Sequence, residues 1–268
     1  MKKSFKISLV LLVFVLCSFA VHQNLPSNEP LSNKAFVTGE KLEYRVHYGF
    51  INAGRAEVEI SNKIVKVNER PCYKISAFGR TVGSLDMFTK IRNYYGSYID
   101  TATLVPYKHY RNVKEGNYKL NEEVFFDHKE HKALRKVEGH GDESYDIPGN
   151  AQDIISGFYY LRNMDLDNLK KGDTIKVLGF FENQSFDFKM KYLGKEKVKT
   201  DFGQISSHMI SPIMPPNALF VGENSLKVWI SDDRNRVPLK CKASTYVGAI
   251  EMELVGHSGL KSKLGEGK

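Results

Sequence analysis

KLEYRVHYGF, residues 41–50, is the stretch of sequence that decides the fold class, because every second residue in it is apolar. Apolar positions 42, 44, 46, 48 and 50 alternate with more polar ones, as expected of a half-buried antiparallel strand. A turn at Gly49–Gly54 and a second alternating run at Arg55–Ile60 follow. The two runs are therefore expected to form a hairpin, with Phe50 among its buried positions.

The same alternation recurs along most of the chain, and turn residues such as Glu115-Gly116-Asn117 separate the runs. Further strands are expected at Tyr73–Ala77, Ile91–Ile99, Tyr107–Val113, Tyr118–Phe126, Leu134–Val137, Thr174–Phe181, Phe186–Tyr192, Ile205–Ile213, Leu226–Ser231, Val237–Tyr246 and Ile250–Val255. Helical spacing predicts one amphipathic helix at Asp153–Asn163, capped by Asp153, and a shorter helix at Ser84–Lys90. The pattern predicts a mainly antiparallel all-β fold, a curled sheet or an open or closed barrel covered by one helix. Two stacked smaller β-domains dividing near residues 140–150 are the alternative.

The N-terminal residues have the organisation of an export signal. Three lysines precede an apolar stretch at Ile7–Leu16, and small residues surround a cleavage position after Ala20. Cleavage there would discard Cys17, whereas lipidation of Cys17 would tether the protein to a membrane. We expect residues 1–20 to be a signal peptide, 21–35 a flexible leader, 36–256 a single β-rich domain and 257–268 a disordered basic tail. The protein is thus expected to be exported to the periplasm or cell envelope.

The charge balance argues against nucleic acid as a partner. The chain has 39 Lys and Arg against 31 Asp and Glu, a formal charge of +8. Removing the three lysines of the predicted signal leaves 36 against 31, or +5. Phosphate-binding loops and dinucleotide fingerprints are also missing from the sequence, so no cofactor is expected.

Three segments resemble a bacterial exported family known as domain of unknown function number 3108. They are Gly39–Ala56, then Asp153–Arg162, and finally Val228–Asp233 with Val237–Leu239 and Gly248–Leu254. The resemblance covers residues 36–256 and implies an envelope location, but no activity and no catalytic residues. The last two strands also resemble those of carriers that ferry lipoproteins across the periplasm in a half-open barrel, a likeness of fold only.

The sequence assigns no catalytic residue and no metal site. His128 and His131 are expected to be solvated turn residues, because positions i and i+3 of a hairpin tip project to different sides. Asp232, Asp233 and Asn235 lack the spacing of a calcium loop and indicate a polar turn instead. Without a G-x-S-x-G elbow or a justified triad, an enzyme is possible but not indicated.

Two cysteines lie outside the predicted signal, and an even count in an exported protein suggests a disulfide between Cys72 and Cys241. Alternation turns Cys241 inward but places Cys72 on the same face as Lys74 and Ser76. The pattern therefore favours two separate thiols over a bridge.

Aromatic residues supply the candidates for a ligand site. Most fall on inward strand faces, as a β-core requires, but Trp229 shares the outer face of its strand with Lys227 and Ser231. Tyr159, Tyr160 and Arg162 lie on the predicted helix and would suit an amphiphile or a sugar. We expect a non-enzymatic protein that holds a hydrophobic or amphiphilic ligand, such as a lipid. An envelope glycan-binding module, or a structural or assembly factor with protein partners, is the alternative; the oligomeric state stays open.

Overall fold

A computed structural model of the chain describes residues 28–213, 224–246 and 248–267. These residues form fifteen β-strands and two α-helices. The first half contains β1 (Lys41–Tyr48), β2 (Ile51–Ile60), β3 (Val65–Val67), β4 (Arg70–Thr81), α1 (Gly83–Phe88), β5 (Ile91–Asp100), β6 (Pro106–Glu115), β7 (Tyr118–Asp127), β8 (Lys132–Val137) and β9 (Glu143–Asp146). The second half contains α2 (Ile154–Asn163), β10 (Thr174–Phe181), β11 (Gln184–Thr200), β12 (Gly203–Pro212), β13 (Leu226–Ser231), β14 (Pro238–Thr245) and β15 (Gly248–Ser258).

All the strands belong to one curled sheet that does not close on itself. The order across it is β10-β11-β12-β13-β14-β15-β1-β2-β4-β5-β6-β7-β8-β9, with β3 paired to β4, and neighbouring strands run antiparallel. The sequence-based fold class is confirmed. The sheet does not divide near residues 140–150, because β1 lies between β15 and β2 and joins the two halves of the chain.

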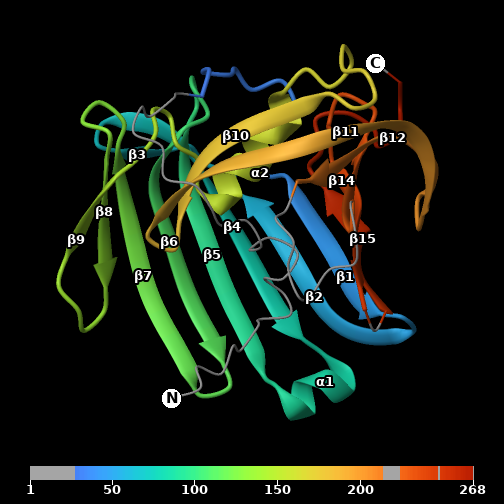
Figure 1. The fold of residues 1–268 in the computed structure, drawn as a ribbon, viewed down its shortest axis with the longest axis horizontal. Helices are drawn as coiled ribbons and strands as arrows, with labels where there is room; N and C mark the ends of the chain where they lie inside the picture. The colour runs from blue at the N-terminus through green and yellow to red at the C-terminus, as the bar shows by residue number, and fades with distance from the viewer. Residues whose placement is uncertain (1–27, 214–223, 247, 268) are drawn as a thin grey trace.

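Helix α2 lies on the concave side of this sheet. It begins as predicted at Asp153, whose carboxylate accepts hydrogen bonds from the backbone N–H groups of Ile155 and Ser156, while the Ser156 hydroxyl lies 2.8 Å from the Asp153 nitrogen. In Figure 1, β10 and β11 cross in front of α2. The helix contacts both β10 and β5. Neither helix in the described ranges is long and apolar enough to cross a membrane.

The free edge of β10 is covered by segments from elsewhere in the chain. Gln152 forms a parallel bridge with Gly179, and its backbone bonds to Leu178 and Phe180. A Cβ atom at position 179 would lie 2.9 Å from the Gln152 oxygen, so only glycine allows this approach. The Asn28 side chain pairs with both the N–H and the C=O of Leu178. These contacts give the open sheet its barrel-like outline.

A buried ion pair between Arg162 and Glu40 ties α2 to the rest of the fold. Both side chains are fully buried, and the guanidinium nitrogens lie 2.5 and 2.7 Å from the two carboxylate oxygens. Arg162 also donates to the carbonyl oxygens of Asn235 and Ala35. One guanidinium therefore connects the helix, the segment before β1 and the turn between β13 and β14.

Several boundary predictions need correction. The tail predicted to be disordered packs on the sheet: Leu260 and Leu264 contact the core, and Gly265 donates to the Asp233 carboxylate. The described part of the predicted leader, residues 28–35, is held in place, because Asn28 bonds to Leu178 and Ala35 is buried and hydrogen-bonded. Phe50 lies fully exposed in the turn after β1 rather than in the core, since the strand ends at Tyr48. The predicted signal peptide, its cleavage position and Cys17 lie outside the described residues.

Breaking the Arg162–Glu40 pair should be among the most damaging single changes in this fold. Replacing Glu40→Gln leaves a buried guanidinium without its counter-charge, which typically costs about 3–5 kcal/mol of unfolding free energy. Urea unfolding followed by circular dichroism measures it. The double variant Glu40→Gln/Arg162→Met removes both charges and is expected to recover part of the loss. A Glu40→Gln protein within 1 kcal/mol of the parent would contradict the assignment.

Candidate functional site

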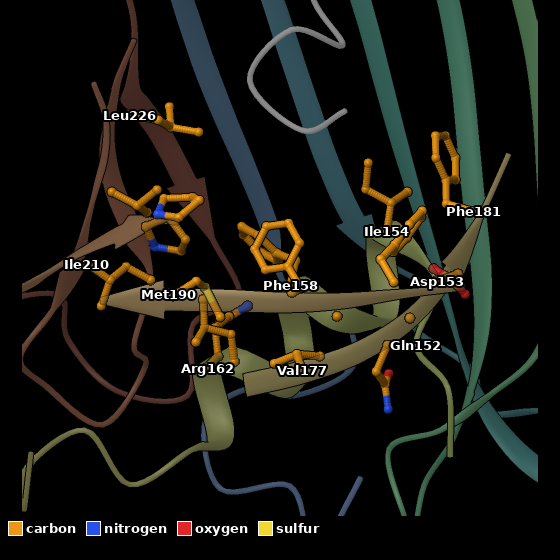
Figure 2. A pocket seen from close by; sticks show the side chains of 18 of the residues that line it. Gln152, Asp153, Ile154, Phe158, Arg162, Val177, Phe181, Met190, Ile210 and Leu226 are labelled. Carbon is orange, nitrogen blue, oxygen red and sulfur yellow. The ribbon is translucent and has the colours of Figure 1, made fainter. Parts of the chain in front are cut away.

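A cavity of about 230 Å³ lies between α2 and the strands β10–β14. Its apolar end is formed by residues of the sheet, and Figure 2 shows Met190, Ile210 and Leu226 at this end. At the other end the wall includes four polar side chains, those of Gln152, Asp153, Glu182 and Gln184. Phe158, on α2, lies between the two ends in the same view. The cavity is therefore amphiphilic along its length.

The polar end is built around the residue that caps the helix. Asp153 accepts a hydrogen bond of 2.6 Å from the Ser97 hydroxyl on β5, in addition to the backbone groups that it caps. Its other neighbour is His109 on β6, whose Nδ1 lies 3.6 Å from a carboxylate oxygen. One carboxylate thus fixes the start of α2 against two strands of the opposite wall.

Three buried side chains near the start of α2 carry polar atoms that have no hydrogen-bond partner within the described part of the chain. They are the imidazole nitrogens of His109, the hydroxyl of Tyr95 and the Oε1 atom of Gln152, and of the three residues Gln152 lines the cavity. Burial lowers the pKa of His109 in spite of the nearby Asp153 carboxylate, so the ring is neutral at pH 7. Burial likewise raises the pKa of Tyr95. Both groups are therefore uncharged at neutral pH, and both lie outside the lining of the cavity.

A buried charge cluster lies on the neighbouring strands. Glu122 on β7 accepts from Arg111 at 2.7 and 3.2 Å and from Arg135 at 2.6 Å, and Arg111 also reaches Glu182 at 3.0 Å. Burial alone would raise the pKa of Glu122, but Arg111 and Arg135 lower it by more. The pKa of this carboxyl is therefore below its ordinary value. The carboxylate stays ionised, and the arginines are neutralised rather than free to attract an anion.

The four side chains predicted as ligand contacts are largely committed to the protein itself. Tyr159 packs against Phe36 and its hydroxyl lies 3.4 Å from Glu40, while Tyr160 donates to the Glu29 carbonyl. Arg162 reaches the cavity wall, but its guanidinium pairs with Glu40.

Trp229 lies on the face of β13 that turns away from the cavity, whose wall includes its neighbours Val228 and Ile230. Its indole is only 7% exposed and donates to Glu196. The predicted residues therefore do not form an open aromatic platform: of the four, Arg162 reaches the cavity wall, and the rest of the wall is formed by other residues of the same helix and strands.

The two cysteines are separate buried thiols, and the disulfide considered between them is not formed. Cys241 reaches the cavity wall, and burial raises its pKa to about 12. Burial also raises the pKa of Cys72 to about 11. Both stay protonated at neutral pH, so neither has the thiolate that nucleophilic chemistry requires.

Among the residues that the structure describes, two groups of potential metal ligands come together, both within ion-pair networks. Asp167, His208 and Asp232 lie within 4.8 Å of one another, but Lys195 and Arg236 form ion pairs with the same carboxylates. The second group is His47, Glu251 and Glu253. Lys240 and Lys242 pair with Glu251, and Arg45 and Lys240 pair with Glu253. These lysines and arginines already supply the positive charge that a cation would bring.

The histidines flanking the β7–β8 turn differ from expectation in one respect. His131 is exposed in the turn, as predicted, but His128 stacks on Phe126 and its Nε2 lies 2.6 Å from the Pro106 carbonyl oxygen. This ring packs against β6 instead of facing solvent.

Sequence reasoning missed the polar residues of the concave wall. Tyr95 and Ser97 share one face of β5, and His109 and Arg111 share one face of β6. Alternation places these pairs inward, and this signal was available in the sequence. The contact with Asp153 depends on how the sheet curls, which local patterning does not encode.

The protein belongs to the class of open, barrel-like antiparallel β-proteins. Its sheet curls around one helix and an amphiphilic cavity. The chain is a member of the family described as protein of unknown function DUF3108, whose model matches residues 43–255. The resemblance found in the sequence is thereby confirmed. No curated protein matches the sequence.

One solved structure supports the fold class. A β-barrel-like protein of the domain of unknown function DUF1849 from Brucella abortus has a TM-score of 0.56 at 11% identity. The match covers 85% of this chain and 100% of that one. A candidate lipoprotein from Parabacteroides distasonis (TM-score 0.36, 8% identity) and a candidate exported protein with a YmcC-like fold from Bacteroides fragilis (0.32, 8%) also match. Each match covers 86% of this chain and 100% of the other.

The lowered pKa of His109 predicts how stability depends on pH. The folded protein keeps the imidazole neutral, whereas the unfolded chain binds a proton below its ordinary pKa of 6.5. Unfolding is therefore increasingly favoured as pH falls through about 6.5. The variant His109→Gln lacks this loss of stability at low pH. Its melting temperature should therefore fall less between pH 7.5 and pH 5.5 than that of the parent.

The exposed His140 provides the matched control, because His140→Gln also removes one imidazole. Differential scanning fluorimetry of both variants across this pH range gives the comparison. Equal pH dependence in the two variants would show that the burial of His109 makes no contribution.

Proposed function

We propose that this protein is exported to the cell envelope and holds the apolar part of an amphiphilic ligand in the cavity beneath α2, without catalysing a reaction. The cavity itself is the observation that carries this proposal. Its wall is mostly apolar from Phe158 to Leu226, where the Arg162 guanidinium is paired with Glu40, and the other polar side chains gather around Asp153. Such a division suits a molecule with an apolar chain and a hydrogen-bonding end.

The size of the cavity limits the ligand. Its volume of about 230 Å³ is somewhat below the ~300–1,000 Å³ typical of sites for drug-sized molecules. One acyl chain or a compact aromatic amphiphile fits this space better than a whole phospholipid. Removing that apolar surface from water would supply most of the affinity, at about 25 cal/mol per Å².

The polar end favours an uncharged head group. Asp153 is held by Ser97 and by two backbone N–H groups, and the nearby arginines are paired with carboxylates. An anionic head group would find these arginines already neutralised, and a cationic one would have to displace the existing partners of the carboxylates. An uncharged hydroxyl, ester or amide brings no buried charge that needs a counter-ion. The ligand class that follows is a neutral amphiphile.

Export is part of the proposal because the predicted signal peptide at residues 1–20 has the required order of basic, apolar and small residues. The alternative of a tether through Cys17 places the same domain beside a membrane. In both cases the ligand would be met in the envelope, where amphiphiles are abundant.

Filling the cavity should strongly weaken ligand binding. We expect the purified protein to bind the neutral fluorophore 1-N-phenylnaphthylamine, with a rise in its emission as it leaves water. Val228 contributes to the cavity wall and Lys227 precedes it on the same strand, so the two side chains point to opposite faces. Val228→Trp should weaken binding roughly tenfold or more by occupying the space, and Lys227→Trp should leave it unchanged.

Mass spectrometry of an organic extract of the protein purified from its native host provides the second measurement. The expected result is a stoichiometric neutral amphiphile in the parent and in Lys227→Trp, and its loss in Val228→Trp. A protein that carries no amphiphile and binds no fluorophore, or two variants that bind equally, would overturn the proposal.

A further inference from the structure

Several loops lie along one edge of the sheet, which we call the apolar edge. It consists of residues 48–51, 82–90, 115–118, 213 and 245–246. Antiparallel pairing places them together, because Tyr48 pairs with both Ile51 and Ile250, Thr245 with Gly248, and Glu115 with Tyr118. Gly54 pairs with Thr81, which brings α1 to the same edge. Figure 1 shows α1 and the β1–β2 and β14–β15 turns along this side of the molecule.

Exposed apolar side chains concentrate at the apolar edge. Within the described residues, the most exposed large apolar side chains are Phe50 at 99%, Met87 at 87%, Phe88 at 86% and Tyr246 at 70%. Tyr118 and Ile213 at the same edge come next. Among the described residues, the opposite edge offers Val37, Ile64 and Phe202, all below half exposed. Exposed apolar groups gathered on one side of a molecule indicate a surface that is covered in use.

Helix α1 holds its apolar side chains outward. It has no buried residue, so it contributes nothing to the core. Its position is fixed by Asp86, which pairs with Arg92 at 2.7 and 2.9 Å and accepts from Thr81 at 2.5 Å. This anchorage leaves Met87 and Phe88 on the outside of the loop, where they contact no core.

The charges beside these side chains are mostly positive. Segments 80–92 and 114–119 contain five basic residues, Arg80, Lys90, Arg92, Lys114 and Lys119. They contain two acidic residues, Asp86 and Glu115, a surplus of three positive charges. Asp86 is already paired with Arg92. Segment 48–51 adds no charge.

We propose that the apolar edge docks on the surface of an anionic phospholipid bilayer. Aromatic and long apolar side chains next to lysines and arginines are the composition that partitions into the interface of such a membrane. The tips belong to separate loops and form a rim rather than a groove, which a fluid interface accommodates more readily than a folded partner does. The surplus of positive charge is complementary to anionic head groups.

The cavity reaches the same edge. Pro212 and Leu226, which line it, are the last residue of β12 and the first residue of β13. Docking would therefore bring this end of the cavity to the lipid surface. The docking itself does not depend on a ligand, so it can fail or succeed separately from the proposed function.

Fluorescence quenching by brominated lipids tests which edge meets the membrane. Trp229 is the only tryptophan in the chain, so replacing it by Phe allows a single indole to be placed elsewhere. The double variant Trp229→Phe/Phe88→Trp carries its indole at the apolar edge, and Trp229→Phe/Phe202→Trp carries it at the opposite edge. Vesicles of phosphatidylglycerol with brominated acyl chains should quench the Phe88→Trp protein roughly twofold and the Phe202→Trp protein hardly at all. Equal quenching, or none in either, would overturn the proposal.

Vesicle co-sedimentation gives a second measurement that leaves the buried Trp229 in place. Met87→Asp/Phe88→Asp, and separately Lys90→Glu/Lys119→Glu, should each reduce partition to phosphatidylglycerol vesicles roughly tenfold or more. Ile64→Asp/Phe202→Asp at the opposite edge is the matched control and should bind like the parent. Parent binding should also fall with added salt and on vesicles of phosphatidylcholine alone.

The proposal is overturned if the parent protein does not bind anionic vesicles, or if the apolar-edge variants bind them as well as the control does. Either result would indicate that the edge contacts a partner other than lipid, such as a protein. Circular dichroism of each variant separates this outcome from unfolding. The substituted side chains are exposed, so we expect the variants to fold.

Discussion

The contact between Arg162 and Glu40 is the interaction on which the rest of the structure depends. A helix inside a curled sheet could slide or leave, because apolar packing alone does not specify one position. A buried guanidinium must be neutralised and hydrogen-bonded, and only one placement of α2 satisfies it with Glu40, Ala35 and Asn235. The pair therefore determines where α2 lies, and so determines the shape of the cavity beneath it.

A second polar contact serves the other end of the helix. Asp153 caps α2 and bonds to Ser97, so the helix is tied to β5 at its start and to Glu40 at its last turn. Between these two ties its side chains pack against the sheet without filling the space completely. The cavity survives because polar groups, which tolerate little displacement, hold the helix away from β11–β13. A purely apolar interior would be free to collapse.

Much of the fold could be predicted from the sequence because it depends on local patterns. The alternation in residues 41–48 and the Asp153 cap were sufficient for β1 and for α2. The site was harder, because Glu40 and Arg162 are 122 residues apart and their pairing has no local signal. Phe50 was wrongly predicted to be buried, because the alternation of apolar residues continues into the turn. The tail was wrongly predicted to be disordered, because its many lysines outnumber Leu260 and Leu264, the two residues that pack on the core.

The open sheet has one further consequence, at the edge of β10, where no neighbouring strand continues the sheet. An unpaired strand edge is a template for adding a strand from another copy of the chain, which leads to aggregation. Asn28 reproduces with its amide the two hydrogen bonds that a neighbouring strand would make to Leu178. The short segment before β1 thus acts as a guard against self-association, and its sequence is constrained by solubility as well as by folding.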